Sequence, residues 1–187
     1  MARVVGEGRQ DCSEMIAENS FYIDKTAFIR EWWKSIKDVT LIARPGRFGK
    51  TLTINMTERF FSNRFENQPE PFRNPEIGKD DEIMRLKGTY PVISMTLMSV
   101  NGSSYESLLK GFDSLIRRVF RRYRFLVHDQ EVPDDDREFI AYMGTRKKDA
   151  EGRYAVFDEE EICESFIRLS EISSREHLRK TSFLIKP

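Results

Sequence analysis

The sequence has few of the features that would place a protein in a membrane, a disulfide framework or a metal centre. No apolar run approaches the roughly 18 residues that a membrane span needs, and the first residues lack the apolar core of a secretory signal. The two cysteines, Cys12 and Cys163, lie far apart in the chain and fit no metal-ligand spacing. We therefore expect a cytoplasmic protein with reduced thiols, and we assign no metal site to the isolated His128 and His177.

An excess of charge of either sign is also missing. Lys+Arg and Asp+Glu each number 31, so bulk electrostatics favour neither a nucleic acid nor a membrane surface as partner. A chain of 187 residues is long enough for one domain with a core. We interpret residues 1–187 as that single domain. Its polar, proline-containing stretch 62–88 is an insert or loop with one short helix near Asp81.

Apolar spacing predicts helices that alternate with short strands. Helical periodicity covers residues 24–36, 50–61, 103–126 and 158–178, with a shorter helical piece around Phe139. Asp24 is the expected N-cap of the first helix, and Asp158 and Glu161 have capping-box spacing before the last. Strands are expected at residues 38–45 and 90–97, the second buried on both faces, and at the end of the chain. This order predicts an α/β layered fold with a parallel sheet.

The turn between the first strand and the second helix is the strongest candidate site, residues 43–55, "ARPGRFGKTLTIN". Gly49 lets the backbone approach phosphate oxygens, and the N–H groups at the start of a helix favour an anion. Lys50 would reach the terminal phosphates, and the Thr51 hydroxyl would ligate Mg²⁺. The usual spacing GxxxxGK[ST] needs a glycine where this chain has Arg44, and Pro45 offers no N–H. A turn without a ligand is therefore the alternative.

Three stretches resemble the bacterial AAA-ATPase-like family: residues 19–29, "NSFYIDKTAFI"; residues 39–56, "VTLIARPGRFGKTLTINM"; and residues 88–97, "GTYPVISMTL". In that family the loop reads Arg-Pro-Arg-Arg-Phe-Gly-Lys-Thr/Ser, so the family as a whole lacks the first glycine of the usual spacing. Gly46 stands where a basic residue is usual. The resemblance covers about residues 10–185. It implies a P-loop NTPase-like, three-layer αβα fold with a mainly parallel sheet that is incomplete at the C-terminus. It also implies that ATP and Mg²⁺ bind at Arg44, Pro45, Gly46, Arg47, Phe48, Gly49, Lys50 and Thr51.

The resemblance further implies an acidic residue that this sequence lacks. In the family, a strand ending in an acid orders the Mg²⁺ shell, and a PD-(D/E)xK nuclease-like domain commonly follows. The counterpart here is Leu184-Ile185, which is followed by Lys186 and Pro187. We therefore expect a domain truncated before this acid, with impaired hydrolysis and no assigned catalytic residue. Asp129 is a weak substitute at the end of the long helix, and an intact ATPase with an unrecognised acid is a third interpretation.

The alternative from another class is a non-enzymatic interaction module that contacts nucleic acid through a cluster of arginines. Five guanidinium groups could neutralise several phosphates: Arg117, Arg118, Arg121, Arg122 and Arg124. We favour a structural role for them near the C-terminal end of a helix, where cations suit the helix dipole. Lys25 is interpreted as the neighbour of a helix cap, and Trp32 and Trp33 as core anchors. We expect a nucleotide as ligand and neither a membrane nor a nucleic-acid partner, while oligomerisation stays open.

Overall fold

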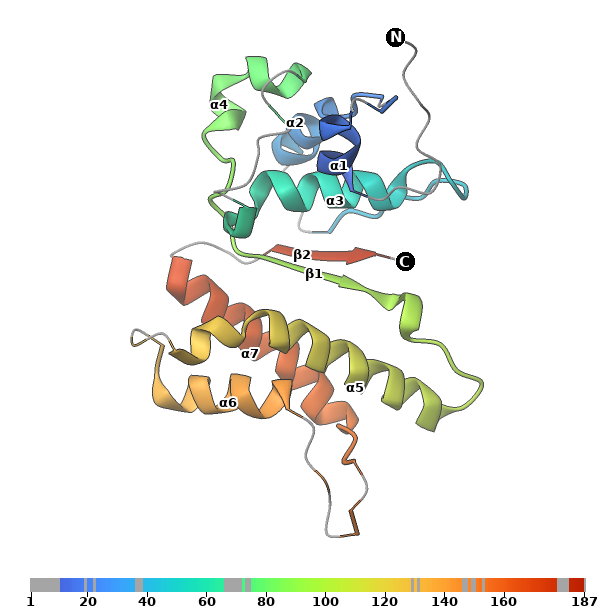
Figure 1. Ribbon diagram of the computed structural model, residues 1–187, viewed down its shortest axis with the longest axis vertical. Helices are drawn as coiled ribbons and strands as arrows, with labels where there is room; N and C mark the ends of the chain where they lie inside the picture. Colours follow the sequence, from blue (N-terminus) through green and yellow to red (C-terminus); the bar gives the residue numbers. More distant parts are fainter. Residues whose placement is uncertain are drawn as a thin grey trace. The chain divides into compact units, whose positions relative to one another are not determined.

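The computed structural model describes most of the chain (Figure 1). The described residues are 11–18, 20–21, 23–35, 39–65, 72, 75–128, 130, 132–145, 148, 151–152, 154–177 and 182–186. The chain divides into two compact units, Met1–Val92 and Ile93–Pro187, which are treated one at a time below. Asp129, the substitute acid considered from the sequence, lies outside the described residues.

The first unit is helical in its described part. Its elements are α1 (Cys12–Ala17), α2 (Ala27–Lys34), α3 (Lys50–Phe61) and α4 (Asp81–Met84), with 3-10 turns η1 (Asn63–Phe65) and η2 (Glu76–Lys79). The periodicity that predicts a helix over residues 50–61 is confirmed at both ends by α3. Met56 and Phe60, which the pattern places on one face, are completely buried. The short helix expected near Asp81 is α4.

Aromatic side chains close the core of the first unit at the C-terminal end of α3. The rings of Trp32 and Trp33 lie 5.6 and 5.4 Å from the ring of Phe61, and Trp33 also meets Tyr90 at 5.3 Å. Both tryptophans are partly buried. Aromatic pairs at these separations add stabilisation beyond the area they bury. The interpretation of both tryptophans as core anchors is therefore confirmed.

The strand expected at residues 38–45 is wrong for the described part of that segment. Residues 39–45 have no strand geometry, and the side chains of Val39 and Leu41 are 86% and 87% exposed. A β-branched, apolar run forms a strand only when a neighbouring strand supplies hydrogen-bond partners. Such a partner is missing among the residues that the structure describes.

The second unit combines a small sheet with three long helices. Its elements are β1 (Val92–Thr96), η3 (Leu97–Ser99), α5 (Tyr105–Arg122), η4 (Arg124–His128), α6 (Asp134–Gly144), α7 (Glu159–His177) and β2 (Ser182–Lys186). Strands β1 and β2 are neighbours in a two-stranded sheet, and their arrows run in the same direction in Figure 1. The fold is thus mixed α/β and mostly helical. The larger sheet of the expected three-layer arrangement is not present in the described ranges, because the segment around Val39 pairs with no strand there.

The core of the second unit forms where β1 meets the three helices. Ile93 and Met95 of β1 belong to one buried cluster with Ile116, Phe120 and a set of residues from α6 and α7. Two of the helices begin at capping boxes, and the one before α7 is the pair that the sequence indicates. Ser104 and Ser107 form a reciprocal capping box at α5, and the Asp158 N–H and the Glu161 N–H each bond the other residue's carboxylate at 3.0 and 2.9 Å before α7. None of the helices described combines the length and apolar character of a membrane span.

Candidate functional site

The turn from residue 44 to residue 51 ends at the N-terminus of α3, which begins at Lys50. Gly49 is the N-cap and has φ 78° and ψ 22°, in the left-handed region that glycine enters without strain. Arg47 also has a positive φ, 62°, which a residue with a Cβ seldom adopts. Two left-handed residues thus lie two positions apart just ahead of the helix.

The backbone donors of this turn have no protein partner in the described part of the chain. The N–H groups from Gly46 to Leu52 donate no hydrogen bond to any residue that the structure describes, and Gly49 has no side-chain cap. The first intrahelical bond is donated by Thr53 N–H to Gly49 O at 2.8 Å. Free donors at a helix N-terminus, together with the helix dipole, form a site for an anion. The geometry expected from the sequence is therefore available for a phosphate.

Lys50 lies over the same turn. Its Nζ donates to Arg44 O at 2.6 Å and to Pro45 O at 3.0 Å, so the ammonium reaches back across the turn that precedes its own helix. The Thr51 hydroxyl has no hydrogen bond within the described ranges, whereas the hydroxyls of Thr53 and Thr57 bond carbonyls one turn back in α3. Of these three threonines, Thr51 alone keeps its hydroxyl available for an outside ligand, which fits a metal-bound oxygen donor.

The rest of the predicted site is open to solvent. Arg44, Pro45, Gly46 and Arg47 are exposed, and the Phe48 side chain is 62% exposed. Neither arginine is ion-paired with an acidic side chain among the residues described. The turn is thus a cationic, solvent-facing loop, and all eight predicted residues, Arg44 to Thr51, lie on it in one continuous stretch.

A further cation at this loop was missed by sequence reasoning, which interpreted Lys25 as the neighbour of a helix cap. Lys25 Nζ donates to Phe48 O at 3.2 Å. A Cβ placed on Gly49 would lie 3.0 Å from the same Nζ. The two residues are separated by more than twenty positions, so no local pattern could reveal the contact; the segment 19–29 was singled out only as part of the family resemblance.

Asp24 does not cap α2 in the way that the sequence predicts, because Thr26 is the N-cap residue. The Asp24 carboxylate instead accepts from Thr26 N–H and from Glu76 N–H, both at 2.8 Å. Burial would raise the pKa of Asp24, but the N–H groups of Glu76 and Thr26 outweigh it and the pKa is lowered. Asp24 therefore ties the segment before α2 to η2, as the Thr26 hydroxyl does by accepting from Ile77 N–H at 3.2 Å.

The arginine cluster of α5 is largely engaged inside the second unit. Arg117 is buried and forms an ion pair with Asp113 at 2.7 Å. Arg118 donates to Ser99 Oγ at 3.0 Å, Arg121 to Gly144 O at 3.1 Å and Arg122 to Ser94 O at 3.2 Å. These bonds join α5 to the segments packed around it. They favour the structural interpretation of the cluster.

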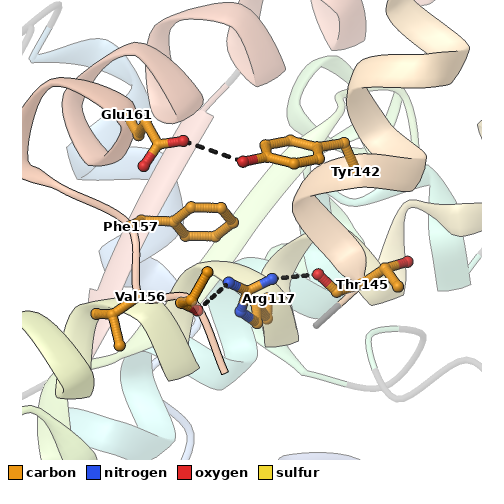
Figure 2. A pocket seen from close by; sticks show the side chains of 7 residues that line it. Arg117, Tyr142, Thr145, Val156, Phe157 and Glu161 are labelled. Atoms are coloured by element: carbon orange, nitrogen blue, oxygen red, sulfur yellow. Dashed lines mark hydrogen bonds between the residues drawn. The ribbon is translucent and has the colours of Figure 1, made fainter. Parts of the chain in front are cut away.

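A cavity of about 140 Å³ opens beside Arg117 (Figure 2). The guanidinium donates to the backbone carbonyls of Thr145 and Ala155 and stacks over the Phe157 ring, 4.0 Å from its centroid. Tyr142 OH bonds Glu161 Oε1 at 3.1 Å, across the Phe157 ring from Arg117 in Figure 2. Each of these polar groups is used by a partner of the same chain, and the cavity is much smaller than the several hundred Å³ of an ordinary ligand pocket. We assign it no ligand.

One of the comparisons with known proteins found a match, which is to a family model. The model of the AAA-ATPase-like family, described as predicted AAA-ATPase, matches residues 7–166, which include the whole turn and Lys25. No curated protein and no solved structure matches the chain.

Proposed function

Because the chain belongs to the AAA-ATPase-like family, we propose that it binds ATP with Mg²⁺ at residues 44–51. One observation carries the proposal: in the described part of the chain, the N–H groups from Gly46 to Leu52 have no protein partner, and they lie at the N-terminus of a helix whose first residue is Lys50. A polyphosphate supplies acceptors for such donors, and it supplies negative charge where the helix dipole is positive.

Different groups of the turn would contact different parts of the ligand. The loop N–H groups would hold the phosphate oxygens, and Lys50 would exchange the carbonyls of Arg44 and Pro45 for anionic oxygens, which are stronger acceptors. The Thr51 hydroxyl would contribute one ligand to Mg²⁺. The metal, when bound, neutralises charge on the phosphates.

Calorimetric titration and thermal unfolding of the full chain test this function. At about 100 times its dissociation constant, Mg-ATP should stabilise the fold by about 2.7 kcal/mol, a melting shift on the order of 5 to 10 °C for a chain of this size. Lys50→Ala should abolish the heat of binding and the shift, while Lys79→Ala, an exposed lysine in η2, should keep both. A wild-type chain that gives no heat and no shift at millimolar Mg-ATP would overturn the proposal. Titration with other nucleoside triphosphates tests the choice of base.

We propose in addition that the chain turns ATP over slowly. In the resembled family, the acidic residue that orders Mg²⁺ stands at the end of a strand. The corresponding strand in this chain is β2, and its last residue is Lys186. Catalysis of phosphoryl transfer depends on positioning and charge stabilisation, and β2 (Ser182–Lys186) contains no acidic residue to supply them. Phosphate release at saturating Mg-ATP should lie far below the roughly 1 to 100 per second of kinases. Fast release that disappears in Lys50→Ala would overturn the slow-turnover proposal and leave the binding proposal intact.

A further inference from the structure

We infer that Lys25 is a second phosphate-binding cation of the loop and contacts a polyphosphate oxygen beside Gly49. This inference rests on the proposed nucleotide binding and extends it to a residue outside the loop's own sequence. Its starting point is the position of the ammonium: Lys25 Nζ lies 3.2 Å from Phe48 O and 3.0 Å from the point where a side chain on Gly49 would begin. The space that glycine leaves open at the helix N-cap therefore faces a positive charge.

The backbone on both sides of Lys25 is fixed, which keeps its side chain close to the loop. Asp24 accepts the N–H groups of Thr26 and Glu76, and Thr26, which is 1% exposed, accepts Ile77 N–H through its hydroxyl. The bonds from Glu76 and Ile77 join residues about fifty positions apart. An anchored backbone lowers the entropy that a long side chain loses when it holds a ligand.

The hydrogen bond to Phe48 O does not by itself explain why an ammonium group lies beside the loop. A lysine that bonds one neutral carbonyl in an exposed site gives up part of its hydration for little gain. The loop also concentrates positive charge, since Lys25, Arg44, Arg47 and Lys50 form no ion pair with an acid in the part of the chain that the structure describes. Like charges on one loop repel one another unless an anion binds there. A di- or triphosphate relieves that repulsion.

The two ammonium groups bond opposite ends of the turn. Lys50 bonds the carbonyls of Arg44 and Pro45 at its start, and Lys25 bonds the carbonyl of Phe48 at its end. Lys25 is thus placed to contact a different phosphate oxygen from the one that Lys50 contacts. Its contribution should depend on the phosphate chain and be independent of the base.

Titration calorimetry on the full-length chain tests the inference with two probes, Mg-ATP and magnesium pyrophosphate, which has no base. Lys25→Met should weaken both by about ten- to a hundredfold, the effect of losing one hydrogen bond between charged groups. Lys25→Arg should bind within a few-fold of the wild type, and Lys79→Met should bind unchanged. If the wild type binds, Lys50→Ala does not, and Lys25→Met binds within twofold of the wild type, Lys25 has no such role and the proposed function stands. A wild type that binds neither probe overturns the proposed function itself.

Acetylation of the unmutated chain gives a second readout that needs no folded variant. Saturating magnesium pyrophosphate should slow the acetylation of Lys25 and Lys50 by several-fold, as measured by mass spectrometry of peptides, and should leave Lys79 unaffected. Protection of Lys50 without protection of Lys25 would overturn the inference.

Discussion

Replacing Arg117 by methionine should destabilise the chain far more than the loss of an ordinary charged residue. The side chains of Arg117 and Asp113 are 4% and 1% exposed. Arg117 Nε donates to Asp113 Oδ1 and Oδ2 at 2.9 and 3.0 Å, and its Nη2 to Oδ1 at 2.7 Å. Without the guanidinium, the Asp113 carboxylate keeps the Phe157 N–H at 3.3 Å but loses the hydrogen bonds and the charge that Arg117 supplies.

The magnitude follows from that burial. Removing one member of a buried ion pair costs about 3 to 5 kcal/mol, because the other charge stays desolvated without compensation. Asp113→Leu should cost a similar amount, since it leaves the guanidinium with two neutral carbonyls and the Phe157 ring as partners. The double variant Asp113→Leu/Arg117→Met should lose much less than the sum of the two single changes. An apolar pair of similar volume leaves no buried charge behind.

Urea unfolding followed by two probes measures this loss. Both tryptophans of the chain, Trp32 and Trp33, belong to the first unit, so their fluorescence reports on that unit, while far-UV circular dichroism reports on all helices. The dichroism transition of Arg117→Met should move to lower urea. Arg124→Met, a change to an exposed arginine beside the same helix, serves as the matched control and should cost little. A loss in Arg117→Met below about 1 kcal/mol, the value of an exposed pair, would refute the reasoning.

Four further outcomes are expected. Asp24→Asn should lower the free energy of unfolding above about pH 5. Because the pKa of Asp24 is lowered in the fold, the difference from the wild type should vanish as the pH falls through that pKa. A constant difference down to pH 2 would contradict this. Burial raises the pKa of the Cys12 thiol to about 11, so only the exposed Cys163 should react quickly with a disulfide reagent at pH 8, and two fast thiols in the native chain would contradict this. Gly49→Ala should cost about 1 to 2 kcal/mol of stability, because Gly49 has a positive φ, and it should weaken Mg-ATP binding. Gly46→Ala should leave stability unchanged, because the space around its Cβ position is open. Duplex and single-stranded DNA should bind no tighter than micromolar at physiological salt, and tight, salt-sensitive binding that is lost on replacing the arginines of α5 would support the interaction module instead.

Sequence patterns predict this fold well where structure depends on residues close in the chain. The capping box at Asp158 and Glu161 and the apolar stripe of α3 involve neighbours three or four positions apart, and both appear as expected. Prediction failed where the outcome depends on a distant partner. Val39 and Leu41 have strand-forming side chains but no strand beside them in the described residues.

The candidate site shows the same division. The order of Gly49, Lys50 and Thr51 in the sequence is enough to place an N-cap and the first turn of a helix, and the structure has both. Two contacts could not be foreseen: that of Lys25 with Phe48 O and that of Asp24 with Glu76 N–H, because each joins segments separated by intervening helices. A local capping rule assigned Asp24 to its own helix, and the distant donor changed its role.

The guanidinium of Arg117 has a consequence for how the second unit tolerates changes in length. The carbonyls of Thr145 and Ala155 each accept one bond from it, which holds together the two ends of the segment between them. Once such ends are held, each doubling of the segment between them costs only about 0.6 kcal/mol of closure entropy. Gly152 is exposed and has no atom within 4 Å of its Cβ position. An epitope or a reporter peptide inserted at that residue would lengthen the segment while the helices on either side kept their packing.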